Sequence, residues 1–369
     1  MRKILYMILA AALVLSLTAC GEAAQTEVTD NANTRVITDA LGREVTVPTE
    51  VDAIVVLGNT PRMVTYLGLA DKVVGYSGMD AESITPLTAY ANVTKDDWAD
   101  VPVVGTDSSG NTSYNSEAII LTDADVIFCT ATSDVADQLQ RETGIPCVAV
   151  SQGTLFGEDF EQSLLTIADV CGVTERAEAI IAYVDECFAE LESLTADIPE
   201  SELHTVLSAA ATFRGTHGID GIRVNDPVML SVNAVNLADA DADTDAKNSY
   251  TVDKEQILTW NPEYIFLDSG GVPLVKQDYA EHPEFYAELD AFQNGRMYQY
   301  PSSTSYYDNM EISLVNCYYV GSVLYPEQFA GIDFEAKAGE IFDFFLGEPD
   351  YINTLADYGA YYGTVDLNG

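Results

Sequence analysis

Two stretches of the chain, SEAIILTDADVIF at 116–128 and KEQILTWNPEYIF at 254–266, match each other position by position. Each begins with a short segment typical of a helix and ends in an apolar run typical of a buried strand. A glutamate, Glu117 or Glu255, stands at the start of each stretch. A helix-then-strand unit that recurs in two separate contexts indicates a duplicated architecture. We therefore expect two lobes of similar construction.

Short apolar runs alternate with helical segments on both sides of the middle of the chain. They include AIVVLG at 53–58 and DVIFCTAT at 125–132 in the first half, and HTVLSAAATF at 204–213 in the second. Apolar runs of this kind are typical of strands in a parallel sheet that helices cover on both faces. The predicted fold class is therefore α/β. Before the first run, RVITDALGREVTVP at 35–48 predicts a hairpin.

A long helical segment separates the two halves. In VTERAEAIIAYVDECFAELESLTADIP at 173–199, apolar residues recur at steps of three and four along one stripe. A helix of this length would measure roughly 30 Å, about the diameter of a small domain. A core-packing helix is one interpretation, and a rigid strut between lobes is the one we favour. The predicted organisation is a lobe at 34–165, a helical strut at 166–200 and a lobe at 201–369, with a ligand cleft between the lobes.

The N-terminus predicts export. Arg2 and Lys3 precede an apolar run that is too short for a membrane span, and small residues lead to Cys20. The LTAC ending resembles the bacterial lipobox, after which the cysteine is lipidated; an ordinary signal peptide is the alternative. Residues 20–33 are polar and predict a flexible tether. We expect a signal peptide at 1–19 and an extracytoplasmic protein held at the cell membrane by a lipid on Cys20.

The chain is strongly acidic. It has 59 acidic residues against 16 basic ones, a formal net charge of −43. Such a surface repels the phosphates of nucleic acids and anionic lipid headgroups. The acids are spread along the chain, which indicates solubility outside the cell and not a specific acidic ligand site. We therefore expect no nucleic-acid partner, and membrane contact through the lipid anchor only.

Cysteine and histidine do not predict a metal site or a catalytic centre. After Cys20 the remaining cysteines show no C-x-x-C spacing, and the three histidines are scattered. The cysteines are expected to be buried free thiols. The chain also lacks a G-x-S-x-G elbow, a P-loop and a G-x-G-x-x-G after a strand. A binding protein without an intrinsic cofactor is the preferred interpretation, and an exported hydrolase is the alternative.

Candidate ligand-binding residues follow the predicted strands, because ligands of open α/β sheets bind beyond the carboxyl ends of the strands. Arg62 would suit a carboxylate- or hydroxamate-bearing chelate, although a surface arginine paired with an acid is equally compatible. Arg214 and His217 share a glycine-rich loop, where the histidine could bind a metal, donate to a chelate or bond only to backbone. Tyr306 and Tyr307 could line a cleft. The other candidates are polar loop residues: Asn59, Asp107, Ser108, Thr130 and Asn233.

Four phrases occur in order along the chain: ITDALGREVTVP, MVTYLGLADKVVGYS, EQILTWNPEYIFLD and YYVGSVLYPEQF. Together with the lipobox and the long middle helix, they make residues 36–345 resemble the Fe/B12-type substrate-binding proteins of ABC importers, which serve siderophores, haem and cobalamin. The resemblance implies two Rossmann-like lobes on one helical backbone. It also implies an iron complex, a siderophore or haem-like chelate, as the expected ligand, with a corrinoid or another metal chelate as the alternative.

The same resemblance implies a partner, namely a permease dimer with its ATPase subunits. In this family a surface glutamate on each lobe docks with arginines of the permease. The matching positions are Glu117 and Glu255. A carboxylate in the first turn of a helix is stabilised by the helix dipole and points away from the lobe. Ordinary helix-start glutamates are the alternative interpretation of both residues.

Overall fold

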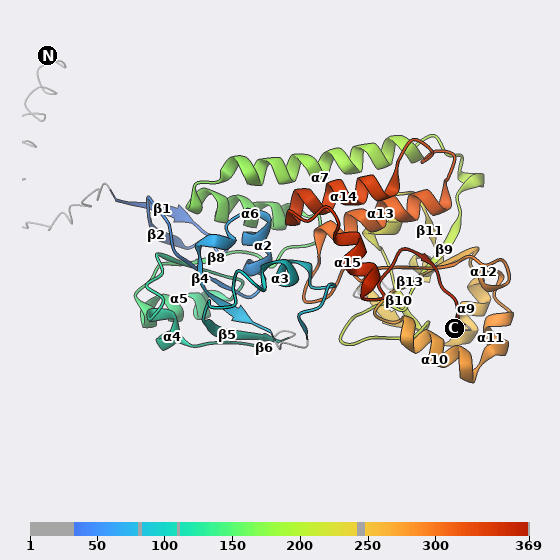
Figure 1. Ribbon diagram of the computed structural model, residues 1–369, viewed down its shortest axis with the longest axis horizontal. Coiled ribbons are helices and arrows are strands. Elements are labelled where there is room, and N and C mark those ends of the chain that lie inside the picture. The colour runs from blue at the N-terminus through green and yellow to red at the C-terminus, as the bar shows by residue number, and fades with distance from the viewer. Residues whose placement is uncertain (1–32, 80–82, 109–110, 242–247, 368–369) are drawn as a thin grey trace, which may run out of the picture.

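The computed structural model describes residues 33–79, 83–108, 111–241 and 248–367. Two α/β lobes lie side by side, and the helix α7 (Thr174–Thr195) extends along both of them (Figure 1). The predicted α/β class and the two lobes are therefore confirmed. The predicted signal peptide at 1–19, Cys20 and the tether as far as residue 32 lie outside the described residues.

The first lobe contains a six-stranded sheet in the order β6-β5-β4-β3-β7-β8. Its strands are β3 (Ile54–Leu57), β4 (Val73–Gly78), β5 (Val103–Ser108), β6 (Asn111–Tyr114), β7 (Val126–Cys129) and β8 (Cys147–Ala149). All neighbours run parallel except β5 and β6. Every residue of β3 and β7 is buried, as their continuous apolar runs predict. The helices of this lobe are α2 (Thr60–Tyr66), α3 (Ala89–Thr94), α4 (Ser116–Ile120), α5 (Ser133–Thr143) and α6 (Glu158–Cys171).

The predicted hairpin is present as the antiparallel pair β1 (Thr34–Thr38) and β2 (Glu44–Pro48). A partly buried ion pair joins it to the edge of the sheet. Asp39 pairs with Arg43 at 2.6 Å. From this pair, Arg43 Nη2 donates to the carbonyl of Cys147 (2.7 Å), and Asp39 Oδ2 accepts from the amide of Ala149 (3.1 Å). The hairpin is therefore anchored to β8 by side chains.

The second lobe contains a seven-stranded sheet in the order β12-β10-β9-β13-β14-β15, with β11 also paired to β9. Its strands are β9 (Thr205–Ala209), β10 (Gly221–Arg223), β11 (Val235–Asn236), β12 (Ser249–Thr251), β13 (Tyr264–Asp268), β14 (Met297–Tyr300) and β15 (Gly363–Thr364). The central strands are parallel, but β10, β12 and β15 are antiparallel to their neighbours. The helices of this lobe are α8 (Pro227–Leu230), α9 (Lys254–Trp260), α10 (Val272–Glu281), α11 (Pro283–Ala287) and α12 (Asp290–Gln293).

The repeated sequence has the same place in both lobes. In the first lobe α4 leads into β7, which pairs with β3, and in the second α9 leads into β13, which pairs with β9. The matched acids just before these strands have matched roles. Asp125 Oδ2 accepts from the amides of Asp52 and Ala53 at 2.9 Å each, immediately before β3. Glu263 Oε2 accepts from the amide of Thr205, the first residue of β9, at 3.0 Å.

Backbone conformation repeats as well. Asp123 and its match Asn261 both have positive φ, 52° and 41°. Asn and Asp adopt this left-handed conformation more readily than other residues with a side chain. The chain therefore turns out of the helix toward the buried strand in the same way in each lobe.

The helix α7 buries one stripe of side chains, as its periodicity predicts: Ala177, Ile180, Val184, Cys187, Leu191 and Thr195. The predicted strut segment at 166–200 differs from the structure at its start. Residues up to Cys171 belong to α6, which ends at Gly172 with φ 74°. Glycine adopts this conformation without steric cost, so the chain turns there before α7 begins.

The last helices, α13 (Met310–Leu324), α14 (Phe334–Leu346) and α15 (Tyr351–Asp357), do not stay with the second lobe. Nearly all of α13 is buried, and it packs against α7, α8 and α14. In turn α14 contacts α2 and α3 of the first lobe. A mostly apolar helix without a polar face must be covered on all sides. One core therefore continues across both lobes, whereas the sequence assigned 201–369 to the second lobe alone.

The five cysteines in the described part of the chain are buried and free, as expected. Burial raises the pKa of the Cys171 and Cys317 thiols to about 12, so both stay protonated and unreactive at neutral pH. Cys129 and Cys147 lie in neighbouring strands with their sulfur atoms 3.5 Å apart. A separate finding is that none of the helices described is long and apolar enough to cross a membrane.

Candidate functional site

The loops that follow the strands of both lobes meet where the lobes face each other. Residues 302–309, which follow β14 and which we call the crossing loop, contact both sides. The Tyr306 hydroxyl donates to Ser83 Oγ at 3.3 Å, and Asn309 Nδ2 donates to the carbonyl of Leu87 at 3.2 Å, both in the first lobe. Thr304 Oγ1 donates to the carbonyl of Thr212, in the loop after β9, at 3.1 Å. The carboxyl ends of the two sheets therefore share one site.

Arg62, in the first turn of α2, is completely buried at this site. Its guanidinium donates to Asn59 Oδ1 (2.5 Å), to Asn309 Oδ1 (3.2 Å) and to the carbonyls of Ser305 and Tyr306. All these acceptors are neutral, and Nε has no partner among the described residues. In this structure the arginine therefore fastens the crossing loop to α2 and does not face solvent.

Asn59 and Thr130 lie beside Arg62. Asn59 Nδ2 donates to the carbonyl of Gln152 (3.0 Å), and its amide donates to Thr130 Oγ1 (3.1 Å). Close packing depends on Gly58, because a Cβ there would lie 2.1 Å from Thr130 Oγ1, and because its φ is 69°. Asn59 also lines a small cavity between the lobes together with Gln152, Tyr307 and Asp308.

The crossing loop is strained at two adjacent residues. Tyr306 and Tyr307 have φ values of 47° and 73°, a region that bulky residues rarely adopt. Such a conformation costs on the order of 1–3 kcal/mol per residue and persists only where the surroundings enforce it. The hydrogen bond from Arg62 to the Tyr306 carbonyl is one such constraint. The two tyrosines are thus held at the interlobe site by contacts with the first lobe.

Arg214 and His217 lie in the loop after β9, on the second lobe. The His217 ring stacks on Phe213 at 3.9 Å between centroids, and its Nδ1 contacts the carbonyl of Ala211 at 3.2 Å. Arg214 is exposed, has a φ of 49° and forms no hydrogen bond or ion pair with any other residue that the structure describes. The loop therefore offers one fixed imidazole and one available guanidinium.

Three candidates from the sequence are not part of this cluster as the structure describes it: Asn233, Asp107 and Ser108. Asn233 lies at the opposite end of the sheet, where its Nδ2 donates to Thr195 Oγ1 at the end of α7 (3.1 Å). It stands just before β11, which pairs with the first residues of β9. Asp107 and Ser108 end β5, and their side chains lie outside what the structure describes.

Sequence reasoning missed a buried charged cluster in the second lobe. Arg223 lies 3.3 Å from Asp268 Oδ2 and 3.9 Å from Asp226 Oδ2. Burial raises the pKa of the Asp268 and Asp308 carboxyls, and the charge of Arg223 opposes this rise. One signal was available: Asp268 directly follows the apolar run YIFL, so a carboxylate at a buried strand end could have been expected.

The two predicted docking residues are equivalent in position. Glu117 is the second residue of α4 and Glu255 the second residue of α9, and both are exposed. The helix α4 has a side-chain N-cap, because Asn115 Oδ1 accepts from the amide of Ala118 at 3.0 Å. The residue before α9, Asp253, makes no such bond.

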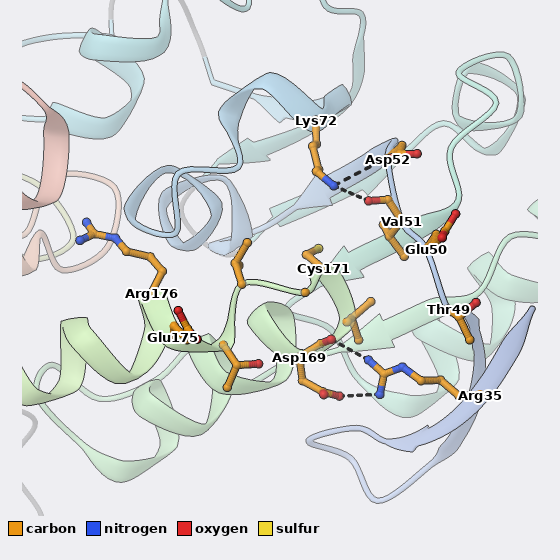
Figure 2. Close-up of a pocket in the computed structure, with 14 residues that line it drawn as sticks. Arg35, Thr49, Glu50, Val51, Asp52, Lys72, Asp169, Cys171, Glu175 and Arg176 are labelled. Carbon is orange, nitrogen blue, oxygen red and sulfur yellow. Dashed lines mark hydrogen bonds and ion pairs between the residues drawn. The ribbon is translucent and has the colours of Figure 1, made fainter.

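The structure also contains a hollow of about 890 Å³ far from the interlobe site. It lies at the amino ends of β3 and β4, against the turn between α6 and α7. Figure 2 shows Arg35 bound to Asp169, and Lys72 bound to the Val51 carbonyl and close to Asp52. The basic groups there already have partners. Within the described ranges, no group of three or more His, Cys, Asp or Glu side chains is placed to hold a metal ion.

Known proteins share this two-lobe geometry. Residues 54–304 match the model of a family described as periplasmic binding protein. A comparison with curated proteins finds no match. Solved structures with the same architecture include a periplasmic solute binding protein from Veillonella parvula, at 20% identity and a TM-score of 0.67, covering 89% of this chain and 98% of that one.

Two further solved structures are similar. The molybdate periplasmic binding protein MolA of Haemophilus influenzae has 20% identity and a TM-score of 0.64, with 85% of this chain and 98% of that one covered. The haem binding protein HmuT has 23% identity and a TM-score of 0.50, with 81% of this chain and 93% of that one covered. At these identities the likeness establishes the two-lobe fold.

Proposed function

The chain belongs to the periplasmic binding protein family, and from this premise we propose that it is the substrate-binding lipoprotein of an ABC importer. In this role it captures an iron complex outside the cytoplasm, a siderophore or haem-like chelate, and delivers it to a permease. It acts by binding and release, without an intrinsic cofactor and without catalysis. Its location is extracytoplasmic.

The observation that carries the ligand proposal is the meeting of strand-end loops from both lobes at the crossing loop. Ligands of open α/β sheets bind at such ends. In this region the available guanidinium of Arg214 suits the carboxylate or catecholate oxygens of a chelate. Tyr307 and Asn59 line the adjoining interlobe cavity, and His217 lies in the same loop as Arg214. A corrinoid or another metal chelate is the alternative ligand in the same role.

A titration tests the ligand class. The lipid-free domain, residues 21–369, is titrated with ferric siderophores of the hydroxamate and catecholate classes, haemin, cobalamin and molybdate. The quenching of tryptophan fluorescence is followed. We expect saturable one-to-one binding of at least one ferric complex. Binding of cobalamin alone would support the alternative ligand, and binding of molybdate alone would overturn the chelate assignment.

Glu117 and Glu255 are the proposed docking points on the permease dimer with its ATPase subunits. What supports this is their matched position at the second residue of a helix and their exposure in both lobes. Two carboxylates fixed on one rigid body would set the register of a basic, dimeric partner. Charge reversal at both positions, E117K with E255K, should abolish uptake and leave ligand affinity unchanged.

The chain offers a matched control for that experiment. Glu335 and Glu284 are also exposed and are also the second residues of their helices, α14 and α11. The pair E335K with E284K changes the net charge by the same amount. Uptake should persist in this control. Equal loss of uptake in both double variants would show that total charge matters and not the docking positions.

The proposed anchor has a direct test. Cys20→Ser removes the thiol that the lipobox would lipidate. In cell fractionation, the wild-type protein should remain with membranes and the C20S protein should be released in soluble form. Retention of C20S in the membrane fraction would contradict the lipid anchor.

A further inference from the structure

The two proposed docking faces differ in the apolar surface that they expose. We propose that the face of α4 formed by Glu117, Ile120 and Leu121 provides most of the binding energy for the permease, and that the matched face of α9 contributes mainly charge. This inference rests on the proposed function, because it assigns weights to the two docking points of the same complex.

The face on α4 combines a carboxylate with exposed aliphatic groups. Ile120 and Leu121 lie three and four residues after Glu117, a spacing that puts all three on one side of a helical turn. Leu121 is 84% exposed and Ile120 is 45% exposed. The neighbouring Ile119 is fully buried in the first-lobe core, which fixes the turn from beneath. Aliphatic side chains next to a charge are therefore displayed on a rigid base.

The matched face on α9 has no comparable display. Leu258, which matches Ile120, packs partly buried against the core of the second lobe. Thr259, which matches Leu121, is exposed but polar, and its hydroxyl donates to the carbonyl of Glu255 at 2.8 Å. Burying a leucine at an interface removes far more apolar surface from water than burying a threonine. Because the two stretches match position by position, the difference in exposed apolar surface lies at equivalent residues.

The first turn of α4 also has a side-chain cap that the first turn of α9 lacks. Asn115 Oδ1 accepts from the amide of Ala118, and the Asn115 amide donates to the carbonyl of Val104 at 2.8 Å. These bonds fix the helix start to β5. The start of α9 has no side-chain cap. A preorganised face loses less conformational freedom on binding, which favours a long-lived contact.

Charge identifies the kind of partner. Glu117 makes no ion pair with another residue in the described ranges. Glu142, whose carboxylate accepts from Ser116 Oγ at 2.5 Å beside it, makes none either. A partner with a basic side chain next to an apolar depression would satisfy both parts of this face. Anionic lipid is disfavoured by the net charge of −43. A two-fold dimer through this face is disfavoured because it would bring the carboxylates of Glu117 and Glu142 from both copies into one interface.

Binding kinetics test the inference. The lipid-free protein is passed over its cognate permease–ATPase complex in immobilised nanodiscs, and association and dissociation rates are measured at two salt concentrations. We expect L121S to raise the dissociation rate about tenfold while the association rate changes little, because apolar burial acts on complex lifetime. E117K should lower the association rate and weaken its salt dependence.

Two variants serve as controls. Thr259→Ala changes the matched position on α9, and Leu230→Ser changes a leucine of α8 that is 54% exposed elsewhere on the molecule. Both should leave the dissociation rate within about twofold of the wild type. The inference is overturned if L121S dissociates like the wild type, or if T259A or L230S accelerates dissociation as much as L121S.

Different experimental results would contradict the docking roles and the unequal weighting of the two faces. If E117K with E255K binds the permease as well as the wild type does, the docking roles themselves are wrong. If that double variant fails to bind while L121S behaves like the wild type, docking stands and only its unequal weighting falls.

Discussion

The two lobes agree at one end of their sheets and differ at the other. At the amino ends, Asp125 and Glu263 both accept backbone amides at the start of the neighbouring strand. At the carboxyl ends, Arg62 of the first lobe donates its hydrogen bonds to neutral acceptors, whereas Arg223 of the second lies within ion-pair distance of two carboxylates. The duplicated part of the sequence therefore corresponds to what holds the strands together. The divergent part corresponds to the end where we place the ligand.

Two arginines in equivalent positions also differ between the lobes, in their burial and in their hydrogen bonds. Arg62 and Arg214 both follow the first parallel strand of their lobe, and the sequence made both candidates for ligand contact. Arg62 is fully buried and joins α2 to the crossing loop. Arg214 is exposed and makes no hydrogen bond or ion pair to a described residue. The first should therefore matter most for stability, and the second most for affinity.

The largest effect is expected from Arg62→Met. Hydrogen bonds from a charged donor contribute about 1.5–3 kcal/mol each, and the variant leaves several buried acceptors without a donor. The free energy of unfolding should fall by about 3 kcal/mol, measured by urea denaturation. The matched variant R214M should stay within about 0.5 kcal/mol of the wild type. If R62M is as stable as R214M, the contrast between the two arginines is wrong.

The next largest change in the free energy of unfolding is expected at the two matched acids. Asp125 accepts two backbone amides, whereas Glu263 accepts one and also contacts His204. Asp125→Ala should lower the free energy of unfolding by about 2 kcal/mol and Glu263→Ala by about 1 kcal/mol. Thermal or urea unfolding of the two variants in parallel measures the difference. A larger loss in E263A would break the correspondence between acceptor number and stability.

The pH dependence of Glu263 is a smaller effect with a defined sign. Burial raises the pKa of its carboxyl, but the Thr205 amide and the charge of His204 outweigh this and hold it below the ordinary value. A depressed pKa stabilises the folded state above the ordinary glutamate pKa, near 4.3. This contribution is lost as pH falls through the folded-state value. E263Q should therefore be less stable than the wild type at pH 7, and the gap should close in acid. A gap that widens in acid would contradict the assignment.

The smallest effect concerns the matched left-handed positions. Asp123→Gly should leave stability within about 0.5 kcal/mol, because glycine adopts this conformation freely. Asn261→Gly should cost about 1 kcal/mol, because Asn261 Oδ1 also accepts from the amide of Asp290 at 3.0 Å. Equal effects from the two substitutions would show that this hydrogen bond adds nothing measurable.

The sequence predicted those parts of the fold that depend on local pattern. The continuous apolar runs at β3 and β7 predicted the parallel sheets, and the apolar stripe on α7 predicted the connecting helix. The four phrases that occur in order along the chain indicated the family. Contacts between distant segments were not readable. The path of α13 and α14 back to the first lobe depends on which segments cover a helix without a polar face, and the pattern of that helix does not specify them.

The candidate site was predictable in its location but less so in its side chains. Asn59, Thr130, Arg62 and the tyrosines do meet between the lobes, because the carboxyl ends of the strands converge there. Sequence could not indicate that Arg62 turns inward, since that depends on the carbonyls of a loop far along the chain. Asn233 follows a short helix, α8, that carries it to the other end of the sheet, and its polarity alone could not indicate that position.

The most direct test of the account is the affinity of the lipid-free protein for a ferric chelate, measured by isothermal titration for wild type and R214M. We expect one-to-one binding by the wild type. We expect at least about tenfold weaker binding by R214M, which corresponds to the loss of one charge-assisted hydrogen bond, with no change in stability. No binding of any ferric complex by the wild type, or equal affinity in the two proteins, would contradict it.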